Sequence, residues 1–407
     1  MIRILFSVDG DAPLDAQLSR LGGLAPLPPF SVQARAFVTD FARRVFALPV
    51  LREHPELATL AHWFRPAAQE HLSRRLQAPD NEHLLARGLV FHLAPANVDV
   101  LFAYAWLMSV LAGNRNVARL SQKPSAQREA LVSILHAMQA EGLHGEILQR
   151  SVLLTYPHDD AVTTLLSRHC HARIIWGGDA TVAKIRSLPL APLAVELAFP
   201  DRFGVCAIRA NTVLEADDNQ LPELAHRFSN DVLWFGQQAC SSPRTVYWIG
   251  DPIQIQAAKA RFWNCVKSLA RQLEDEPAAL MARVTDAHLL AATVGPLELS
   301  GALGDYPLTL QSAHADGEQR EMQSGHGLVI DVELADLPSL AGQLDDRDQT
   351  LVQHGFSREE LLALTANLQN RAIDRIVPLG RALDFHPVWD GSDLMDTLTR
   401  KITLPAA

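Results

Sequence analysis

Short apolar runs alternate with helical patterns from Leu89 onward, and this alternation restricts the possible folds more than any other feature of the chain. The runs are continuous, as in 89–93, and do not switch between apolar and polar residues. Continuous apolar runs are typical of strands that are buried on both faces. Strands of this kind, separated by helices, form right-handed β-α-β units. The sequence therefore predicts an α/β fold with a parallel sheet covered by helices on both faces.

The first half of the chain repeats this pattern four times. The predicted strands are 89–93, 116–120, 151–156 and 172–176, and the helices after them are expected to begin near Asn97, at Ser125, near Asp159 and after Gly177-Gly178. An edge strand is expected at the N-terminus, over 1–10. Parallel sheets bind ligands at the carboxyl ends of their strands, so the segments that follow these runs are candidates for a binding site.

A second alternation begins after Pro200. Its predicted strands are 204–208, 244–250, 327–332 and 350–354, with a helix over 253–273 and a polar surface loop over 313–324. A chain of 407 residues exceeds the size at which one core keeps growing. We therefore expect one domain over 1–200 and a second over 201–369, with the segment from about 370 to 407 returning to the first domain.

Charge and cysteine usage exclude several classes of protein. The net charge of -10 and the lack of a basic cluster argue against a nucleic-acid partner. The four cysteines have no paired spacing, which predicts a reducing compartment and no metal site. No signal peptide is evident, and the longest nearly apolar run, 100–112, is shorter than the ~20 residues of a membrane span. The expected location is the cytoplasm, with no membrane span.

Cys240 lies between two contrasting segments. The apolar stretch that starts at Asp231 reads as a helix, and Ser241-Ser242-Pro243 is expected to stop it. The β-branched and aromatic run 244–250 follows as a strand. A thiol on such a loop can reach a substrate, because loops often carry reactive groups. Its position alone, however, favours a small buried residue over a nucleophile.

Two further segments combine polar or glycine residues with a strand end. Asn97 follows the strand at 89–93, where its amide could cap a helix or donate a hydrogen bond to an oxyanion. Trp176-Gly177-Gly178 follows the strand at 172–176. Paired glycines either make a tight turn or let the backbone approach a phosphate at a helix N-terminus. Taken alone, Asn97 fits a cap better, and the glycine pair is a weak signal.

The order of these motifs resembles that of the fatty acyl-CoA reductases of the LuxC type, a family within the aldehyde dehydrogenase superfamily. The resemblance covers roughly 85–405 and little of the first 80 residues. The motifs that carry it are 94–97 (Ala-Pro-Ala-Asn), 113–119 (Gly-Asn-Arg-Asn-Val-Ala-Arg), 176–178, 237–243 (Gln-Gln-Ala-Cys-Ser-Ser-Pro), 375–380 (Arg-Ile-Val-Pro-Leu-Gly) and 389–391 (Trp-Asp-Gly). It implies an aldehyde dehydrogenase-like fold with a Rossmann-like cofactor domain and a catalytic domain.

The resemblance also assigns roles to individual residues. It makes Cys240 the nucleophile and Asn97 the oxyanion donor. The residues implied to bind the cofactor are Arg119 at a ribose or phosphate, Trp176, Gly177 and Gly178 at the pyrophosphate turn, and Glu321 at the nicotinamide ribose. The relatives that oxidise aldehydes with water carry a general-base Glu where this chain has Ala198. Glu196 lies two residues away and stays open as a substitute base.

The implied activity is reduction of an acyl thioester, on CoA or an acyl-carrier protein, to an aldehyde. Arginine at position 119 suits a 2'-phosphate and so favours NADPH, with NADH as the alternative. A homo-oligomer and an acyl-transferring partner enzyme are the expected assemblies. Three other functions remain open: an aldehyde dehydrogenase that uses water, a cysteine acyltransferase or thioesterase without nicotinamide, and a non-catalytic subunit that holds partner proteins.

Overall fold

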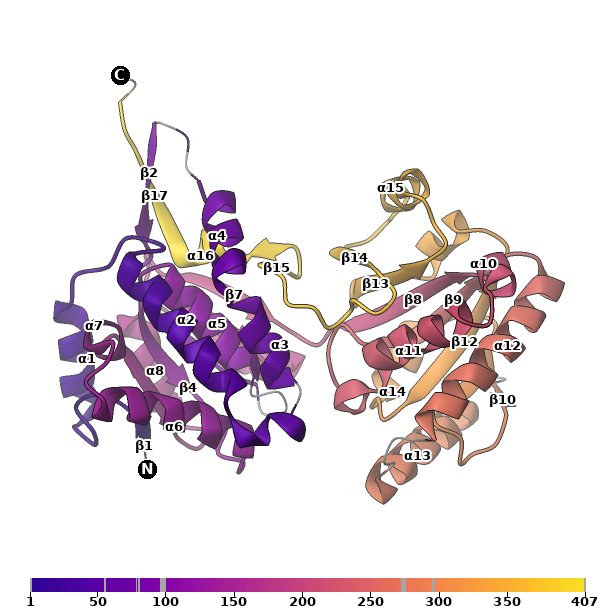
Figure 1. The fold of residues 1–407 in the computed structure, drawn as a ribbon, viewed down its shortest axis with the longest axis horizontal. Helices are drawn as coiled ribbons and strands as arrows, with labels where there is room; N and C mark the ends of the chain where they lie inside the picture. The colour runs from indigo at the N-terminus through magenta and orange to yellow at the C-terminus, as the bar shows by residue number, and fades with distance from the viewer. Residues whose placement is uncertain are drawn as a thin grey trace. The chain divides into compact units, whose positions relative to one another are not determined.

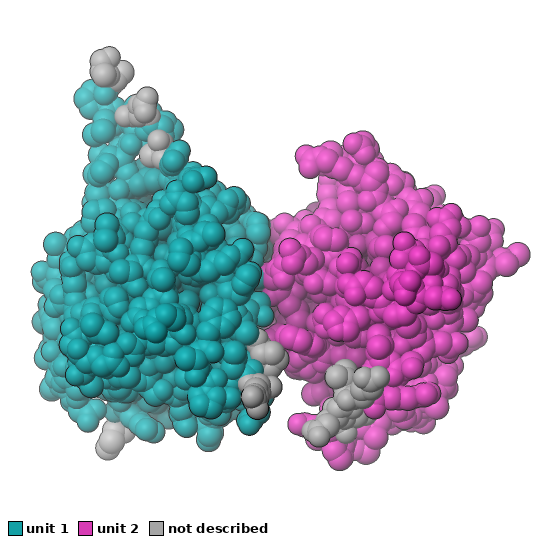
Figure 2. Space-filling view, in the orientation of Figure 1, with its two compact units in different colours: residues 1–200, 385–407 teal, residues 201–384 magenta. Residues whose placement is uncertain are grey.

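The computed structural model describes residues 2–54, 56–77, 79, 81–95, 100–271, 276–294 and 297–405, without the side chain of residue 52. The chain forms two compact units (Figure 2). Unit 1 comprises Met1–Pro200 and Phe385–Ala407, and unit 2 comprises Asp201–Asp384. The return to unit 1 therefore starts at Phe385, later than the expected position near residue 370.

Unit 1 is built on a six-stranded sheet in the order β1-β5-β4-β3-β6-β7 (Figure 1). Its strands are β1 (Arg3–Phe6), β3 (Leu89–Leu93), β4 (Arg115–Arg119), β5 (Ser151–Thr155), β6 (Ala172–Trp176) and β7 (Val195–Phe199). The edge strand β1 runs antiparallel to β5, and the other pairs are parallel. Each predicted strand of this half of the chain is present. The half-buried strand β7 was not predicted.

Helices and short strands complete unit 1. The elements are α1 (Leu14–Gly23), α2 (Val32–Phe46), η1 (Pro49–Arg52), α3 (Glu56–Trp63), α4 (Pro66–Arg75), β2 (Glu82–Ala86), α5 (Val100–Leu111), α6 (Ala126–Ala140), α7 (Gly145–Leu148), α8 (Asp160–His169), α9 (Asp179–Arg186), β15 (Val388–Trp389), β16 (Ser392–Asp393), α16 (Leu394–Leu398) and β17 (Thr399–Thr403). One face of β3 packs with α1, α8 and α9 in a common apolar core. Ser125 and Asp159 cap α6 and α8 as predicted.

Unit 2 contains a seven-stranded sheet in the order β10-β11-β12-β9-β8-β13-β14. Its strands are β8 (Phe203–Arg209), β9 (Pro243–Ile249), β10 (Glu298–Ser300), β11 (Leu308–Ser312), β12 (Leu328–Leu334), β13 (Asp348–His354) and β14 (Arg375–Pro378). All neighbours are parallel except β10 and β11. Because β14 pairs with β13, the segment 370–384 belongs to this unit and not to the returning tail.

Two apolar cores cover the two faces of this sheet. The helices are α10 (Ala210–Glu215), α11 (Gln220–Val232), η2 (Trp234–Gln237), α12 (Pro252–Ala270), α13 (Pro277–Thr293), α14 (Gly317–Met322), η3 (Pro338–Gly342) and α15 (Arg358–Ala366). On one face α10, α11 and α12 pack against β8 and β9, and on the other α13, η3 and α15 do so. The predicted strands and the helix near 253–273 are present. The predicted surface loop at 313–324 is wrong, because it contains α14 with buried Gln319 and Arg320.

In unit 1, β2 and β17 form a separate antiparallel ribbon (Figure 1). The ribbon pairs the segment just before β3 with the C-terminal tail. No helix within the described ranges is both long and apolar enough to cross a bilayer.

Candidate active site

Cys240 is half-buried in the loop between α11 and β9 in unit 2. The helix does not run to Ser241-Ser242-Pro243 as the sequence predicted. It ends at Val232, and Pro243 instead begins β9. The intervening backbone turns left-handed at Phe235 (φ 54°), Gly236 (φ 57°) and Gln237 (φ 63°). Left-handed residues cannot continue an α-helix, and two of these carry a Cβ, so the surrounding contacts must hold the turn in place.

Gln237 supplies the main contacts that fix this turn. Its side chain is completely buried, and its amide reaches two parts of the backbone. Nε2 donates to the Pro243 carbonyl at 2.8 Å, and Oε1 accepts from the Gly327 N–H at 3.0 Å. The first bond spans Cys240 and closes the loop from 237 to 243. The second ties that loop to the segment before β12.

The segment 323–327 lies directly against the cysteine loop. The His326 N–H donates to the Gly236 carbonyl at 2.7 Å, and Gln238 Nε2 donates to the Ser324 carbonyl. A Cβ at Gly325 would lie 2.7 Å from Gln238 Nε2 and 3.0 Å from the Gln237 carbonyl oxygen. A larger residue at position 325 would therefore push the two segments apart, and glycine permits their close approach.

The start of β8 closes the other side of the loop. A Cβ on Gly204 would collide with the Ser241 carbonyl, so the backbone next to Cys240 rests on this glycine. Ser241 and Ser242 are both buried. Cys240 is thus presented at the amino ends of β8, β9 and β12 by a loop that is braced on two sides.

The cofactor-binding residues predicted in the first half of the chain gather at the carboxyl edge of the unit 1 sheet. The register pairs Leu93 of β3 with Arg119 on one side and with Ile175 on the other. Arg119 therefore ends β4 beside the end of β3, and Trp176 ends β6 on the opposite side. Gly178 forms the N-cap of α9, with Gly177 just before it.

These residues differ in what they can offer a ligand. Arg119 is half-buried, its Cζ lies 5.3 Å from the centre of the Tyr156 ring, and Nη2 donates to the Tyr156 carbonyl at 3.3 Å. The Trp176 side chain is 6% exposed and stacks on Phe199 at 3.9 Å between ring centres. It is a core residue, so only its backbone borders the glycine turn.

Gly177 and Gly178 sit where the chain leaves β6 and enters α9. A Cβ on Gly177 would lie 3.1 Å from the Thr181 methyl group, which leaves little room for a larger residue. The turn exposes backbone N–H groups at the start of a helix, where an anion is favoured. The turn accordingly fits a phosphate-bearing ligand, and Arg119 ends β4, on the other side of β3.

Glu196, the substitute base, is already engaged in unit 1. It lies in β7 opposite Arg173, which is buried, and Oε2 accepts from Arg173 Nε at 2.6 Å. Its other oxygen accepts from Arg186 Nε at 2.9 Å. Two guanidinium groups thus hold the carboxylate, and Ala198 stands two residues further along the same strand.

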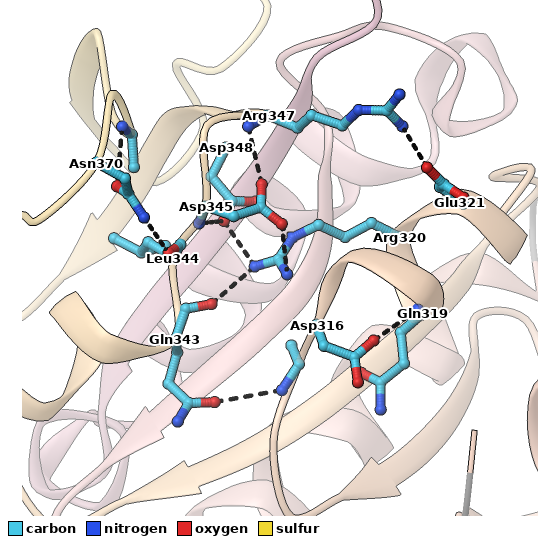
Figure 3. A network of polar contacts seen from close by, with 12 residues as sticks. Asp316, Gln319, Arg320, Glu321, Gln343, Leu344, Asp345, Arg347, Asp348 and Asn370 are labelled. Atoms are coloured by element: carbon cyan, nitrogen blue, oxygen red, sulfur yellow. Dashed lines mark hydrogen bonds and ion pairs between the residues drawn. The ribbon is translucent and has the colours of Figure 1, made fainter.

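Glu321 lies in unit 2, near the end of α14, and its side chain is 65% exposed. Oε1 is 3.6 Å from Arg347 Nη1 (Figure 3). The neighbouring Arg320 points inward, where it donates to both carboxylate oxygens of Asp348, at 2.9 and 2.6 Å (Figure 3). This buried pair anchors α14 to the start of β13 and leaves Glu321 on the surface.

Asn97, the predicted oxyanion donor, lies outside the described residues. Of the other predicted residues, the structure brings Arg119, Trp176, Gly177 and Gly178 together in unit 1, while Cys240 and Glu321 belong to unit 2. Sequence reasoning gave no role to Arg244, which follows Pro243 at the start of β9, beside the cysteine loop. One signal was available: Arg244 is the only Lys or Arg between 231 and 244.

The two α/β units have an aldehyde dehydrogenase-like fold. The fold is similar to an NAD-dependent aldehyde dehydrogenase from Sinorhizobium meliloti, with a TM-score of 0.70, 14% identity, and coverage of 98% of this chain and 88% of that one. It is also similar to PnpE in complex with nicotinamide adenine dinucleotide, with a TM-score of 0.68, 11% identity, and coverage of 98% of this chain and 91% of that one.

The family model described as acyl-CoA reductase (LuxC) matches residues 70–401, so the chain belongs to this family. A long-chain acyl-protein thioester reductase from Aliivibrio fischeri is 26% identical over 172 residues, which cover 42% of this chain and 33% of that protein. The chain thus aligns with about a third of the length of this curated relative.

Proposed function

We propose that the protein reduces an acyl thioester to an aldehyde with NADPH, or alternatively NADH, through a thioacyl-enzyme on Cys240. The observation that carries this proposal is the braced loop that presents Cys240 at the edge of the unit 2 sheet. Membership of the acyl-CoA reductase family and the similarity to the Aliivibrio thioester reductase support the same reaction class.

The first chemical step belongs to Cys240. Its thiolate attacks the thioester carbonyl, a tetrahedral oxyanion forms, and the C–S bond to CoA or to a carrier protein breaks, so that this group leaves as its thiolate. The expected oxyanion donors are the backbone N–H of Cys240 and the amide of Asn97. Because one thioester replaces another, this step depends more on positioning than on driving force. The fixed geometry of the loop serves that need.

The residues at the carboxyl edge of the unit 1 sheet suit a dinucleotide. Backbone N–H groups at the glycine turn would hold the pyrophosphate, and Arg119 would contact a ribose or its 2'-phosphate, with Glu321 proposed for the nicotinamide ribose. When bound, the reduced nicotinamide supplies the hydride that the thioacyl group requires. The solved structure of PnpE with nicotinamide adenine dinucleotide supports this class of cofactor.

The environment of Glu196 supports reduction over hydrolysis. An activated water would cleave the thioacyl-enzyme before reduction, so a nearby general base would waste the acyl group. Ala198 offers no base, and Arg173 and Arg186 both hold the Glu196 carboxylate. We therefore favour the reductase over an aldehyde dehydrogenase that uses water.

The thioester donor is proposed to be acyl-CoA or a protein-bound acyl group. The Aliivibrio relative is named for acyl-protein thioesters, whereas the family is described by acyl-CoA. A homo-oligomer and an acyl-transferring partner enzyme complete the proposal.

The test is a reduced-nicotinamide absorbance assay with a series of acyl-CoAs and acyl-carrier proteins, using each cofactor. We expect oxidation of NADPH or NADH that depends on the thioester and is abolished in Cys240→Ser. Aldehyde oxidation without CoA would indicate the water-using enzyme, and acyl transfer without nicotinamide would indicate an acyltransferase or thioesterase. Absence of any reaction with every thioester would overturn the proposal.

Asn97→Ala tests the proposed oxyanion donor separately. Loss of one such donor typically slows a reaction by roughly 100- to 1,000-fold, so we expect that loss in kcat with the protein still folded. Asn211→Ala, which removes an exposed amide bonded to Glu215, is the matched control and should keep full activity. A normal rate in Asn97→Ala would remove this residue from the mechanism.

A further inference from the structure

Arg244 is fixed at the entrance of β9, four residues after Cys240. Its guanidinium carbon lies 4.5 Å from the centre of the Phe203 ring, and Nη1 donates to the Gln323 carbonyl at 2.6 Å. Gln323 returns a bond, since its Nε2 donates to the Arg244 carbonyl at 3.1 Å. The arginine is therefore held by a ring and a carbonyl, in the same segment that braces the cysteine loop.

Neither of these two partners, the Phe203 ring and the Gln323 carbonyl, carries a negative charge. The Nε of Arg244 is buried and has no hydrogen-bond partner among the described residues. Burial lowers the pKa of Arg244 to about 10, so the group is still charged at neutral pH. The negative charges that oppose this shift are those of Asp201, Cys240 and Asp286. Such an interaction is mutual: a cation that is stabilised by a thiolate also stabilises that thiolate.

We propose that Arg244 is a positioning residue for the nucleophile Cys240. The guanidinium of Arg244, held on the Phe203 ring and the Gln323 carbonyl, stabilises the thiolate form of this cysteine. This inference deepens the proposed function and rests on Cys240 as its nucleophile. Attack on a thioester requires the thiolate, so the arginine would raise the reactive fraction near neutral pH.

Other charged groups surround the same loop. Asp201 precedes β8, and Asp286 on α13 accepts from the Ser324 N–H at 2.8 Å. His326 lies in the bracing segment, and the Arg347 guanidinium carbon is 6.0 Å from the Phe203 ring centre. The negative charges of the two aspartates help to keep Arg244 protonated. They also partly cancel the effect of its positive charge at the Cys240 thiol. Arg347 adds a second positive charge near the same ring.

The test is the rate of iodoacetamide alkylation of Cys240 between pH 5 and 10, read for each cysteine peptide by mass spectrometry. Cys265 is a half-buried internal reference, and burial raises the pKa of its thiol. In Arg244→Gln the midpoint of the Cys240 profile should rise by about one pH unit, which is about tenfold slower labelling near neutral pH. In Arg244→Lys the midpoint of the Cys240 profile should return most of the way to the wild-type value. The Cys265 profile should not change in either variant.

Arg209→Gln is the matched control, because the Arg209 guanidinium carbon also lies over a phenylalanine, 4.7 Å from the Phe356 ring centre, but at the far end of β8. It should leave the Cys240 profile unchanged. An unchanged midpoint in Arg244→Gln would overturn the inference.

The wild-type protein gives a second measurement that does not depend on a variant folding. Its Cys240 midpoint should lie below the ordinary thiol value of about 8.5 and below that of Cys265. A midpoint at or above that value would equally contradict the role of Arg244. Because alkylation needs no acyl substrate, a failure of the reductase assay and a failure of this inference are distinguishable.

Discussion

At the scale of single residues, Gln237 determines the shape of the nucleophile loop most directly. Gln237→Ala would leave the Pro243 carbonyl and the Gly327 N–H without their side-chain partners. Buried groups that lose a partner cost ~1–3 kcal/mol each, so we expect a loss of about 3 kcal/mol in the free energy of unfolding. Acylation of Cys240 should slow as well, because the left-handed turn would no longer be held. Urea unfolding and single-turnover acylation measure the two effects.

Gln256→Ala provides the control for that prediction. Gln256 is exposed on α12 and its amide donates to Glu333 at 2.8 Å, far along the sheet from the bracing segment. Gln256→Ala should change neither the free energy of unfolding nor the rate of acylation of Cys240 appreciably. If Gln237→Ala behaved like Gln256→Ala, the loop would owe its shape to other contacts.

Much of the candidate site was evident from residue types and motif order. Cys240 was placed at a helix-to-strand loop, and Arg119, Gly177 and Gly178 at strand ends, where the structure has them. The function of Arg244 was not evident, because its relation to the loop depends on Phe203 and on Gln323, which lies 79 residues further along the chain. Spacing within a motif does not reveal such a contact.

At the scale of elements, α14 shows how tertiary contacts can override a local pattern. The polar segment 313–324 predicted a surface loop, yet Arg320 and Gln319 are buried there. Arg320 is satisfied by Asp348, 28 residues further along the chain, and by the Gln343 carbonyl at 2.9 Å. A polar composition predicts exposure only if no distant partner is available. The strand boundaries were easier to predict, since continuous apolar runs need no partner to be recognised.

Asp231, at the junction between α11 and the turn after β14, should make the free energy of unfolding depend on pH. Asp231 accepts from the Gly380 N–H at 2.6 Å and from the Ala382 N–H at 2.9 Å. Burial raises the pKa of Asp231 to about 7, against the opposing effect of these two bonds. The unfolded value is about 3.9, so the folded state binds the proton more tightly. The contribution of this group to stability therefore falls as the pH rises from about 4 to about 7.

Asp231→Asn removes this titration. Its free energy of unfolding, measured with urea at several pH values, should change less between pH 5 and pH 7 than that of the wild type. Asp336→Asn is the control, because hydrogen bonds from Ser339 lower the pKa of Asp336, so its titration lies below this window and the change between pH 5 and pH 7 should stay as in the wild type. A wild-type profile in Asp231→Asn would show that Asp231 does not titrate in this window.

At the scale of the whole molecule, the alternation of strands and helices predicted the α/β architecture of both units. The edge and ribbon strands β2, β7, β10, β14 and β17 were not predicted, because they are short or only partly buried, and β11, which lies beside β10, was not predicted either. The ribbon of β2 and β17 also joins segments that are far apart in the sequence. Local patterns therefore predicted the centres of the two sheets better than their margins.

The two units carry different parts of the proposed chemistry. The glycine turn and Arg119 belong to unit 1, and the cysteine loop belongs to unit 2. The covalent step can therefore be examined without the cofactor, since the proposal gives the residues for the cofactor no part in the transfer of the acyl group to Cys240.

The most direct test is to mix the protein with an acyl-CoA in the absence of nicotinamide and to measure the mass of the peptide that carries Cys240. The account predicts an increase equal to the acyl group on this cysteine, absent from Cys240→Ser, and its discharge as aldehyde when NADPH or NADH is added. An unmodified Cys240, or an acyl group found only on another residue, would contradict the account.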